Sequence, residues 1–285
     1  MFTTLALAAA LAAPVPKAVA PDLKWKFTQG DTFYVKATVD ATSTVSAGGP
    51  GVVAQGSTSS AVCVYKATVT AADDKGSTVE VEFLSCKTGI GGGGGAVKLD
   101  DQKGVIGKKL TLTLDPAHKV TKADGFANLG NGGGLFTGEY VQGQLQDLFR
   151  AVPGKALGKG ETWKGEEQLP LADGIGIKRA DRGTVAGTED GLTKLEVESD
   201  NAVTGGPKGG PVIDLKGDKG KRTILFDPKA GRVRKLEENY TVGGNIDVAA
   251  VGGGGGGGAP APGISLNMTM KTTLTVSDEQ PKDEK

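Results

Sequence analysis

One stretch of the sequence occurs twice, and this near-repeat constrains the fold more than any other feature of the chain. Residues 110–124 read LTLTLDPAHKVTKAD, and residues 223–237 read TILFDPKAGRVRKLE. In both stretches, apolar residues alternate with polar ones up to an Asp-Pro pair. The Asp side chain can bond the turn backbone there, and the proline pre-sets φ. The sequence therefore predicts the same strand and turn in two places.

Two further features recur in the same order. A step of glycine, acid, threonine and aromatic residue stands at 30–33 and again at 160–163. A hairpin with a glycine turn stands at 66–83 and again at 182–199. The spacings are similar but not identical, so an internal duplication with variable loops explains the pattern.

The alternation within these hairpins predicts antiparallel sheet. Residues 73–76, Asp-Asp-Lys-Gly, are typical of a type I turn followed by a glycine bulge. This turn places Val69 opposite Val81 on an apolar face, and the matching turn of the second copy places Val185 opposite Leu195. One apolar and one polar face is the pattern of a half-buried antiparallel sheet.

The single histidine of the chain falls in one of the Asp-Pro turns. Gly231 suits the strained backbone position of the later turn, and His118 holds the corresponding place in the earlier one. We therefore interpret His118 as a turn residue rather than a catalyst.

One segment departs from the strand pattern. Residues 137–150 place Val141, Leu145, Leu148 and Phe149 on one helical stripe, with Pro153 just beyond. The predicted fold is mainly β, an antiparallel, strongly curved sheet or half-barrel built from two similar halves, with one central helix. The predicted parts are a signal peptide (1–20), a first β repeat (21–136), a linking helix (137–152), a second β repeat (153–278) and a disordered tail (279–285).

The N-terminus favours export to the periplasm or the extracellular space. A short apolar run with small residues and prolines after it is typical of a signal peptide, although no Lys or Arg precedes it and Pro21 follows the tidiest cleavage site. A disordered Ala-rich tail is the alternative. No segment has the roughly 20 apolar residues that a membrane-spanning helix needs.

The two cysteines, Cys63 and Cys86, favour a disulfide in an exported chain. The register derived above puts them on opposite faces of the sheet, so the bond requires a further bulge or an early end of the strand. Their spacing matches no metal motif.

The sequence offers no site for which catalysis is the better explanation. Basic and acidic residues both number 33, which gives no charge to attract nucleic acid. The polyglycine runs at 91–95, 132–134 and 252–258 lack a phosphate-loop context, and we interpret them as hairpin tips or linkers. The acidic pairs 166–167 and 237–238 are interpreted as solvated strand residues. We therefore expect no catalytic, cofactor-binding or metal-binding residues and no enzyme; a hydrolase ranks as a distant third hypothesis.

Aromatic residues are the better functional lead. Most of them are expected in the core, but a curved sheet closed by the helix could leave an apolar groove for a lipid-like ligand or an envelope protein. The alternative is a purely structural or surface-interaction protein without a small-molecule ligand. The candidate groove residues are Trp25, Phe27, Phe33, Phe83, Trp163 and Phe226.

The sequence also resembles an uncharacterised family of exported bacterial proteins, a domain of unknown function. The likeness covers residues 23–34, the helix with Pro153 and the step at 160–163, the turn at 226–233 and the Thr-rich final strand. That family has no assigned activity, so the resemblance implies no catalytic residues, and the polyglycine runs depart from its pattern. The long strands and the turn Asp-Pro-x-x-Gly-Arg-Val are similar to those of the half-barrel periplasmic lipoprotein carriers. That resemblance implies a fold and fixes no function.

Overall fold

The structure is a computed structural model that describes residues 20–47, 54–92, 97–129, 138–172, 175–205, 212–217, 219–247 and 264–282. Except for Ala20, the predicted signal peptide lies outside the described residues, as do most of the polyglycine runs. Thr137, the first residue of the predicted helix, also lies outside them. The strands are β1 (Asp22–Leu23), β2 (Thr32–Ala47), β3 (Gln55–Asp73), β4 (Gly76–Gly92), β5 (Asp100–Asp101), β6 (Lys109–Leu114), β7 (Val120–Asp124), β8 (Lys155–Ala156), β9 (Thr162–Ala172), β10 (Ile175–Glu189), β11 (Leu192–Gly205), β12 (Val212–Gly217), β13 (Gly220–Asp227), β14 (Arg232–Asp247) and β15 (Ile264–Ser277).

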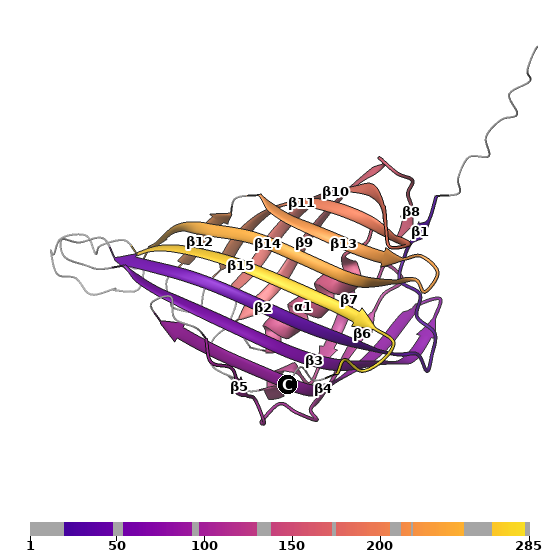
Figure 1. Cartoon of the computed structure of the whole chain (residues 1–285), viewed down its shortest axis with the longest axis horizontal. Coiled ribbons are helices and arrows are strands. Elements are labelled where there is room, and N and C mark those ends of the chain that lie inside the picture. The colour runs from indigo at the N-terminus through magenta and orange to yellow at the C-terminus, as the bar shows by residue number, and fades with distance from the viewer. Residues whose placement is uncertain are drawn as a thin grey trace, which may run out of the picture.

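Among the described residues, all strands except β1 and β8 form one large antiparallel sheet. Its order is β7-β6-β4-β3-β2-β15-β14-β12-β11-β10-β9, with β13 also between β11 and β14 and with β5 beside β4. The sheet curves strongly, as predicted, and its two edge strands, β7 and β9, do not pair with each other (Figure 1). The fold is therefore a curved sheet with one open side.

The two halves follow the same path through this sheet. β2, β3, β4, β6 and β7 are consecutive neighbours in the first half, and β9, β10, β11, β13 and β14 are consecutive neighbours in the second. β15 pairs with β2 on one side and with β14 on the other, which joins the halves. The copies thus stand side by side within one sheet.

Backbone hydrogen bonds repeat between the halves at the glycine-acid step. Gly30 N donates to Val69 O at 2.8 Å, and Gly160 N donates to Val185 O at 2.8 Å. The same two valines donate back to the acidic residue after each glycine, at 2.9 and 3.0 Å. Val69 and Val185 are therefore equivalent positions of the two halves.

The Asp-Pro turns also form as predicted. Oδ1 of Asp115 accepts two backbone N–H bonds at 2.9 Å, and Oδ1 of Asp227 accepts two at 3.0 Å. His118 has a φ of 60° and Gly231 a φ of 63°, so both occupy the left-handed region. His118 is thus located in the turn, where its ring packs edge-on against Phe27.

The predicted register of the first hairpin is wrong. Val69 pairs with Val79 rather than Val81, because the turn closes with Asp73 opposite Gly76 and a bulge follows Val69. A second register shift, between Val64 and Tyr65, brings Cys63 directly opposite Cys86, and the two form the predicted disulfide. In the second copy, Val185 pairs with Leu195 as predicted.

The predicted helix is α1 (Gly138–Arg150), which follows a short 3-10 helix, η1 (Phe126–Leu129). It lies inside the curve of the sheet, where its chain runs from the β7 edge toward the β9 edge (Figure 1). The predicted stripe of Val141, Leu145, Leu148 and Phe149 is buried in the main hydrophobic core. Trp25 Nε1 donates to Leu148 O at 3.2 Å, which ties the N-terminal segment to the helix.

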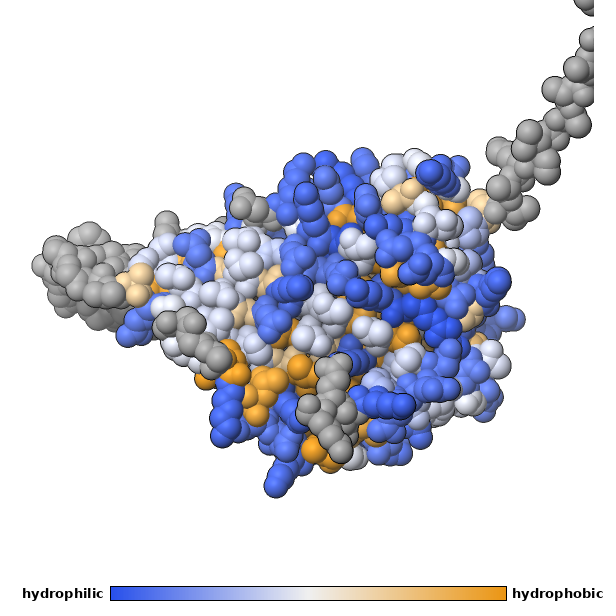
Figure 2. Space-filling view, in the orientation of Figure 1, coloured by the Kyte–Doolittle hydropathy of each residue, from blue (hydrophilic) through white to orange (hydrophobic). Residues whose placement is uncertain are grey.

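The outer surface of the sheet in the view of Figure 2 is mostly hydrophilic or neutral, with scattered apolar side chains. Within the described part of the chain, no helix is long and apolar enough to span a membrane.

Candidate functional site

The six candidate groove aromatics all belong to the main hydrophobic core or pack against it. Phe33, Phe83 and Phe226 are buried in this core, with at most 2% of their surface exposed. Trp25 is equally buried, yet it lines a cavity together with Phe27, which stacks on it at 5.5 Å. Trp163 packs against the same core and lines a different groove. The six side chains therefore share one core, and they do not line one groove.

A buried ionic belt is the feature that sequence reasoning missed. It consists of polar and charged side chains that face the inside of the second half, at one level of neighbouring strands. Arg179 on β10 is in register with Glu167 on β9 and with Asn201 on β11. Arg222 on β13 is in register with Glu238 on β14, which is in register with Thr272 on β15. Asp181 and Ser199 lie one step further along the same inner face.

Asp147 of α1 completes the belt from the helix side. Its Oδ2 accepts a hydrogen bond from Arg179 Nη1 at 3.0 Å, and its Oδ1 accepts one from Arg222 Nη1 at 2.8 Å. Arg179 Nη2 contacts the same carboxylate, and Arg222 Nη2 contacts Asp181. Both arginines and Asp147 are almost completely buried. The helix is therefore fixed to the sheet by charge-assisted bonds in a place that water barely reaches.

The belt has more carboxylates than it can hold ionised at low cost. Burial would raise the pKa of Asp147, but the charges of Arg179 and Arg222 outweigh it and hold that pKa below its usual value. Burial, followed by the charge of Asp147, raises the pKa of Glu238 to about 7. Arg179 lies 3.6 Å from Glu238, yet it is already engaged by Asp147, so this ion pair does not reverse the shift. Burial and the charge of Asp147 also raise the pKa of Glu167.

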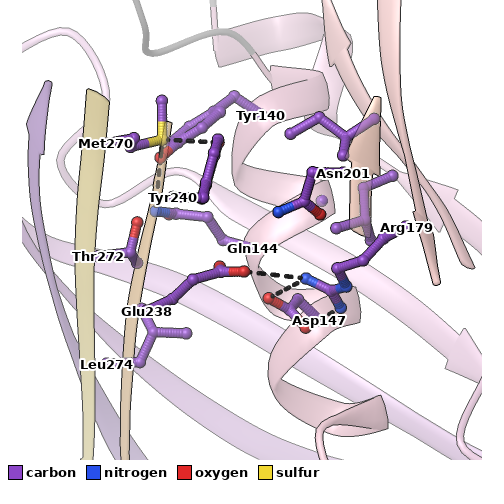
Figure 3. Close-up of a pocket in the computed structure, with 13 residues that line it drawn as sticks. Tyr140, Gln144, Asp147, Arg179, Asn201, Glu238, Tyr240, Met270, Thr272 and Leu274 are labelled. Atoms are coloured by element: carbon purple, nitrogen blue, oxygen red, sulfur yellow. Dashed lines mark hydrogen bonds and ion pairs between the residues drawn. The ribbon is translucent and has the colours of Figure 1, made fainter. Parts of the chain in front are cut away.

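A small cavity of about 40 Å³ lies beside the belt, between α1 and the inner face of the sheet (Figure 3). Tyr140, Tyr240 and Met270 form one wall, and both tyrosine hydroxyls contact the Met270 sulfur. Gln144 Nε2 donates to the Tyr140 hydroxyl at 3.1 Å, whereas Gln144 Oε1 and both polar atoms of the Asn201 amide have no hydrogen-bond partner among the described residues. The volume suits one or two water molecules, which could satisfy these groups, and is too small for a lipid.

The belt could have been found from the second hairpin. The correct pair Val185–Leu195 places residues 177, 179, 181 and 183 on the face of Val185, so Arg179 and Asp181 had to point inward. The acidic pairs were also misjudged. Glu167 and Glu238 are buried side chains of the belt, whereas Glu237 is exposed, because strand neighbours point to opposite faces.

A larger groove lies at the open side of the sheet. Its volume is about 520 Å³, and its lining comes from the β6–β7 turn, the end of α1 with the residues after it, and edge strand β9. Trp163, Val152 and Pro153 supply apolar surface, whereas Lys24 and Arg150 supply positive charge. Gly183 makes room for Trp163, since a side chain at Gly183 would collide with the indole ring. This groove is the candidate binding site, and we call it the edge groove.

Histidine 118 lines the edge groove but is poorly suited to acid–base chemistry. Burial, with a smaller effect from Lys24, lowers its pKa to about 4, so the imidazole is neutral at physiological pH. Among the described residues, no group of three or more His, Cys, Asp or Glu side chains is arranged to hold a metal ion.

Comparison with known proteins gives a fold but no family. No family model matches the chain, and no curated protein matches it. A solved structure described as lipid–protein interactions in lipovitellin matches 91% of this chain with 11% identity and a TM-score of 0.50. The chain spans only 27% of that lipovitellin chain, and the likeness is one of fold alone.

Two further matching structures have lower TM-scores. One is a DUF1329 family protein from Desulfovibrio piger, with 13% identity, coverage of 87% of this chain and 84% of that chain, and a TM-score of 0.17. The other is an outer membrane lipoprotein-sorting protein domain from Vibrio parahaemolyticus, with 11% identity, coverage of 87% of each chain and a TM-score of 0.14. These TM-scores are too low to support an argument about this chain.

Proposed function

We propose that the chain is an exported, non-enzymatic protein that binds a lipid-like ligand in the edge groove. The observation that carries the proposal is the groove itself, an amphipathic trough of about 520 Å³ along the unpaired side of the sheet. Sites for small molecules commonly measure about 300–1,000 Å³ and combine apolar walls with a few polar groups.

The interior of the sheet is a poorer place for an acyl chain. The main hydrophobic cluster is filled by side chains of both halves and of α1, and a second cluster surrounds Tyr140 and Tyr240. Charged residues of the ionic belt separate the two clusters. Because an alkyl chain cannot replace the bonds of these charges, crossing the belt would be costly. The ligand is therefore expected at the edge.

Several observations support export and a lipid-like ligand. The disulfide is typical of proteins that leave the reducing cytosol, and the N-terminal 20 residues have the composition of a signal peptide. The fold likeness to lipovitellin, whose structure concerns lipid–protein interactions, agrees with a lipid-like ligand.

A purely structural or partner-binding role is the second candidate, because the same groove could receive a protein segment. Native mass spectrometry of the protein purified from the cell envelope distinguishes them. A co-purifying lipid supports the first function, and a co-purifying protein without lipid supports the second. An enzyme has the least support, since arginines engage Asp147, Asp181 and Glu167.

The two tryptophans provide a direct test of the binding site. Trp163 is partly exposed in the edge groove, whereas Trp25 is 2% exposed and lines the other cavity, together with Phe27. Because bromine quenches tryptophan on contact, a brominated fatty acid is expected to quench Trp163 fluorescence saturably. In Trp163→Phe, the remaining emission from Trp25 should stay unquenched. Equal quenching of both proteins would place the ligand elsewhere, and no quenching in either would contradict the proposed function.

A further inference from the structure

We propose that the edge groove selects amphiphiles with an anionic headgroup, which pairs with Arg150. This inference rests on the lipid-like ligand proposed above and adds the charge of its head.

Arg150 is the one arginine, among the described residues, that lines the groove. It is the last residue of α1, and its side chain is 30% exposed, compared with 3% for Arg179 and 2% for Arg222. Its Nη1 lies 3.2 Å from Glu167 Oε1. An incoming anion can therefore reach this guanidinium without entering the core.

Glu167 does not depend on Arg150 for a partner. Gln146 Nε2 donates to its Oε1 at 2.9 Å, and Arg179 Nη2 lies 3.5 Å from its Oε2. A buried carboxylate that loses its only partner pays a large desolvation cost, but Glu167 would keep two. Arg150 can thus exchange Glu167 for a ligand carboxylate or phosphate at low cost, and guanidinium binds both in a bidentate manner.

The rim of the groove adds to this preference. Besides Arg150, the charged residues that line it are three lysines, Lys24, Lys155 and Lys164, and three carboxylates, Glu166, Glu167 and Asp181. Two of these carboxylates are already held, Glu167 by Gln146 and arginines and Asp181 by Arg222 and Ser199. The electrostatic potential at the opening of the groove therefore favours an anionic headgroup. Trp163 and Val152 provide an apolar wall for the alkyl chain of the ligand.

Binding of oleate and of its neutral analogue methyl oleate tests the proposal, with calorimetry or the quenching assay as readout. The wild-type protein is expected to bind oleate about tenfold or more tightly than methyl oleate, the usual gain from one charge-assisted pair. Arg150→Met should remove most of this preference, because it removes the guanidinium that pairs with the carboxylate of oleate. The matched control is Arg182→Met, which removes a 64% exposed arginine outside the groove lining and should preserve the preference.

Each outcome bears on one claim. Equal binding of the two probes by the wild type, or a preference that survives Arg150→Met, would overturn the headgroup assignment and leave the proposed function standing. Binding of neither probe would overturn both. If Arg150→Met does not fold, Glu167→Gln decides the matter. That change removes the carboxylate that competes for Arg150, so oleate should bind several-fold more tightly, and unchanged or weaker binding would refute the assignment.

Discussion

Replacing Asp147 by Asn is expected to lower the free energy of unfolding by about 3–5 kcal/mol, the usual cost of breaking a buried ion pair from one side. The substitution keeps the size of the side chain but leaves Arg179 and Arg222 without the carboxylate that both contact. Because these arginines are 3% and 2% exposed, water cannot replace the lost partner. Urea denaturation at pH 7, followed by circular dichroism, measures the change.

An exposed ion pair between β10 and β11 provides the control for this prediction. Arg182 and Asp200 lie 3.7 Å apart with side chains 64% and 55% exposed. Asp200→Asn should therefore cost less than about 1 kcal/mol. Similar costs for the two variants would mean that the ionic belt is better solvated than its burial indicates.

The second large effect is a pH dependence of the free energy of unfolding, which the substitution Glu238→Gln should remove. The folded state raises the pKa of Glu238 from 4.5 to about 7, chiefly through burial and then through the charge of Asp147. A carboxyl group whose folded pKa is raised favours folding when it is protonated. The contribution of Glu238 to the free energy of unfolding is complete below pH 4.5 and is lost as the pH rises through 7. The shift corresponds to roughly 3 kcal/mol.

The measurement compares the unfolding free energies of the wild type and Glu238→Gln between pH 5 and pH 8. The other charged groups that face Glu238, namely Asp147, Asp181, Arg179 and Arg222, are present in both proteins, so the two pH profiles differ only through the change at position 238. The variant should gain stability relative to the wild type as the pH rises, up to roughly 3 kcal/mol at pH 8. Glu237→Gln, at the exposed neighbouring position, should follow the wild type. Parallel pH profiles for Glu238→Gln and the wild type would contradict the raised pKa.

Local sequence patterns predicted the elements well because local physics determines them. The turn residues Asp115, Asp227 and Gly231, the stripe of α1 and the pair Val185–Leu195 all depend on neighbours within a few positions. A register is more fragile, since one bulge changes every later pair. The turn closes Asp73 against Gly76 rather than Ser77, and this difference of one residue placed the cysteines on opposite faces in the predicted register; the bulge after Val69 shifted the pairs of the strand segment between them and the turn.

The candidate site was harder to predict because it depends on contacts between distant segments. The ionic belt joins α1 to six strands, and its residues are distributed from position 147 to position 272. The edge groove exists because β15 pairs with β2 and the sheet then curves until β7 and β9 approach without pairing. Alternation along a single strand carries no information about either contact.

The two similar halves of the sheet are stabilised by different chemistry. Cys63 lies six residues before Val69, and Arg179 lies six residues before the equivalent Val185, so the disulfide and the ionic belt occupy the same level of the two halves. The disulfide is covalent and is broken by a reductant, whereas the ionic belt is electrostatic and is weakened by a change of pH. One continuous sheet thus has two independent points of vulnerability, and a mild treatment chosen for either should loosen one half while the other holds.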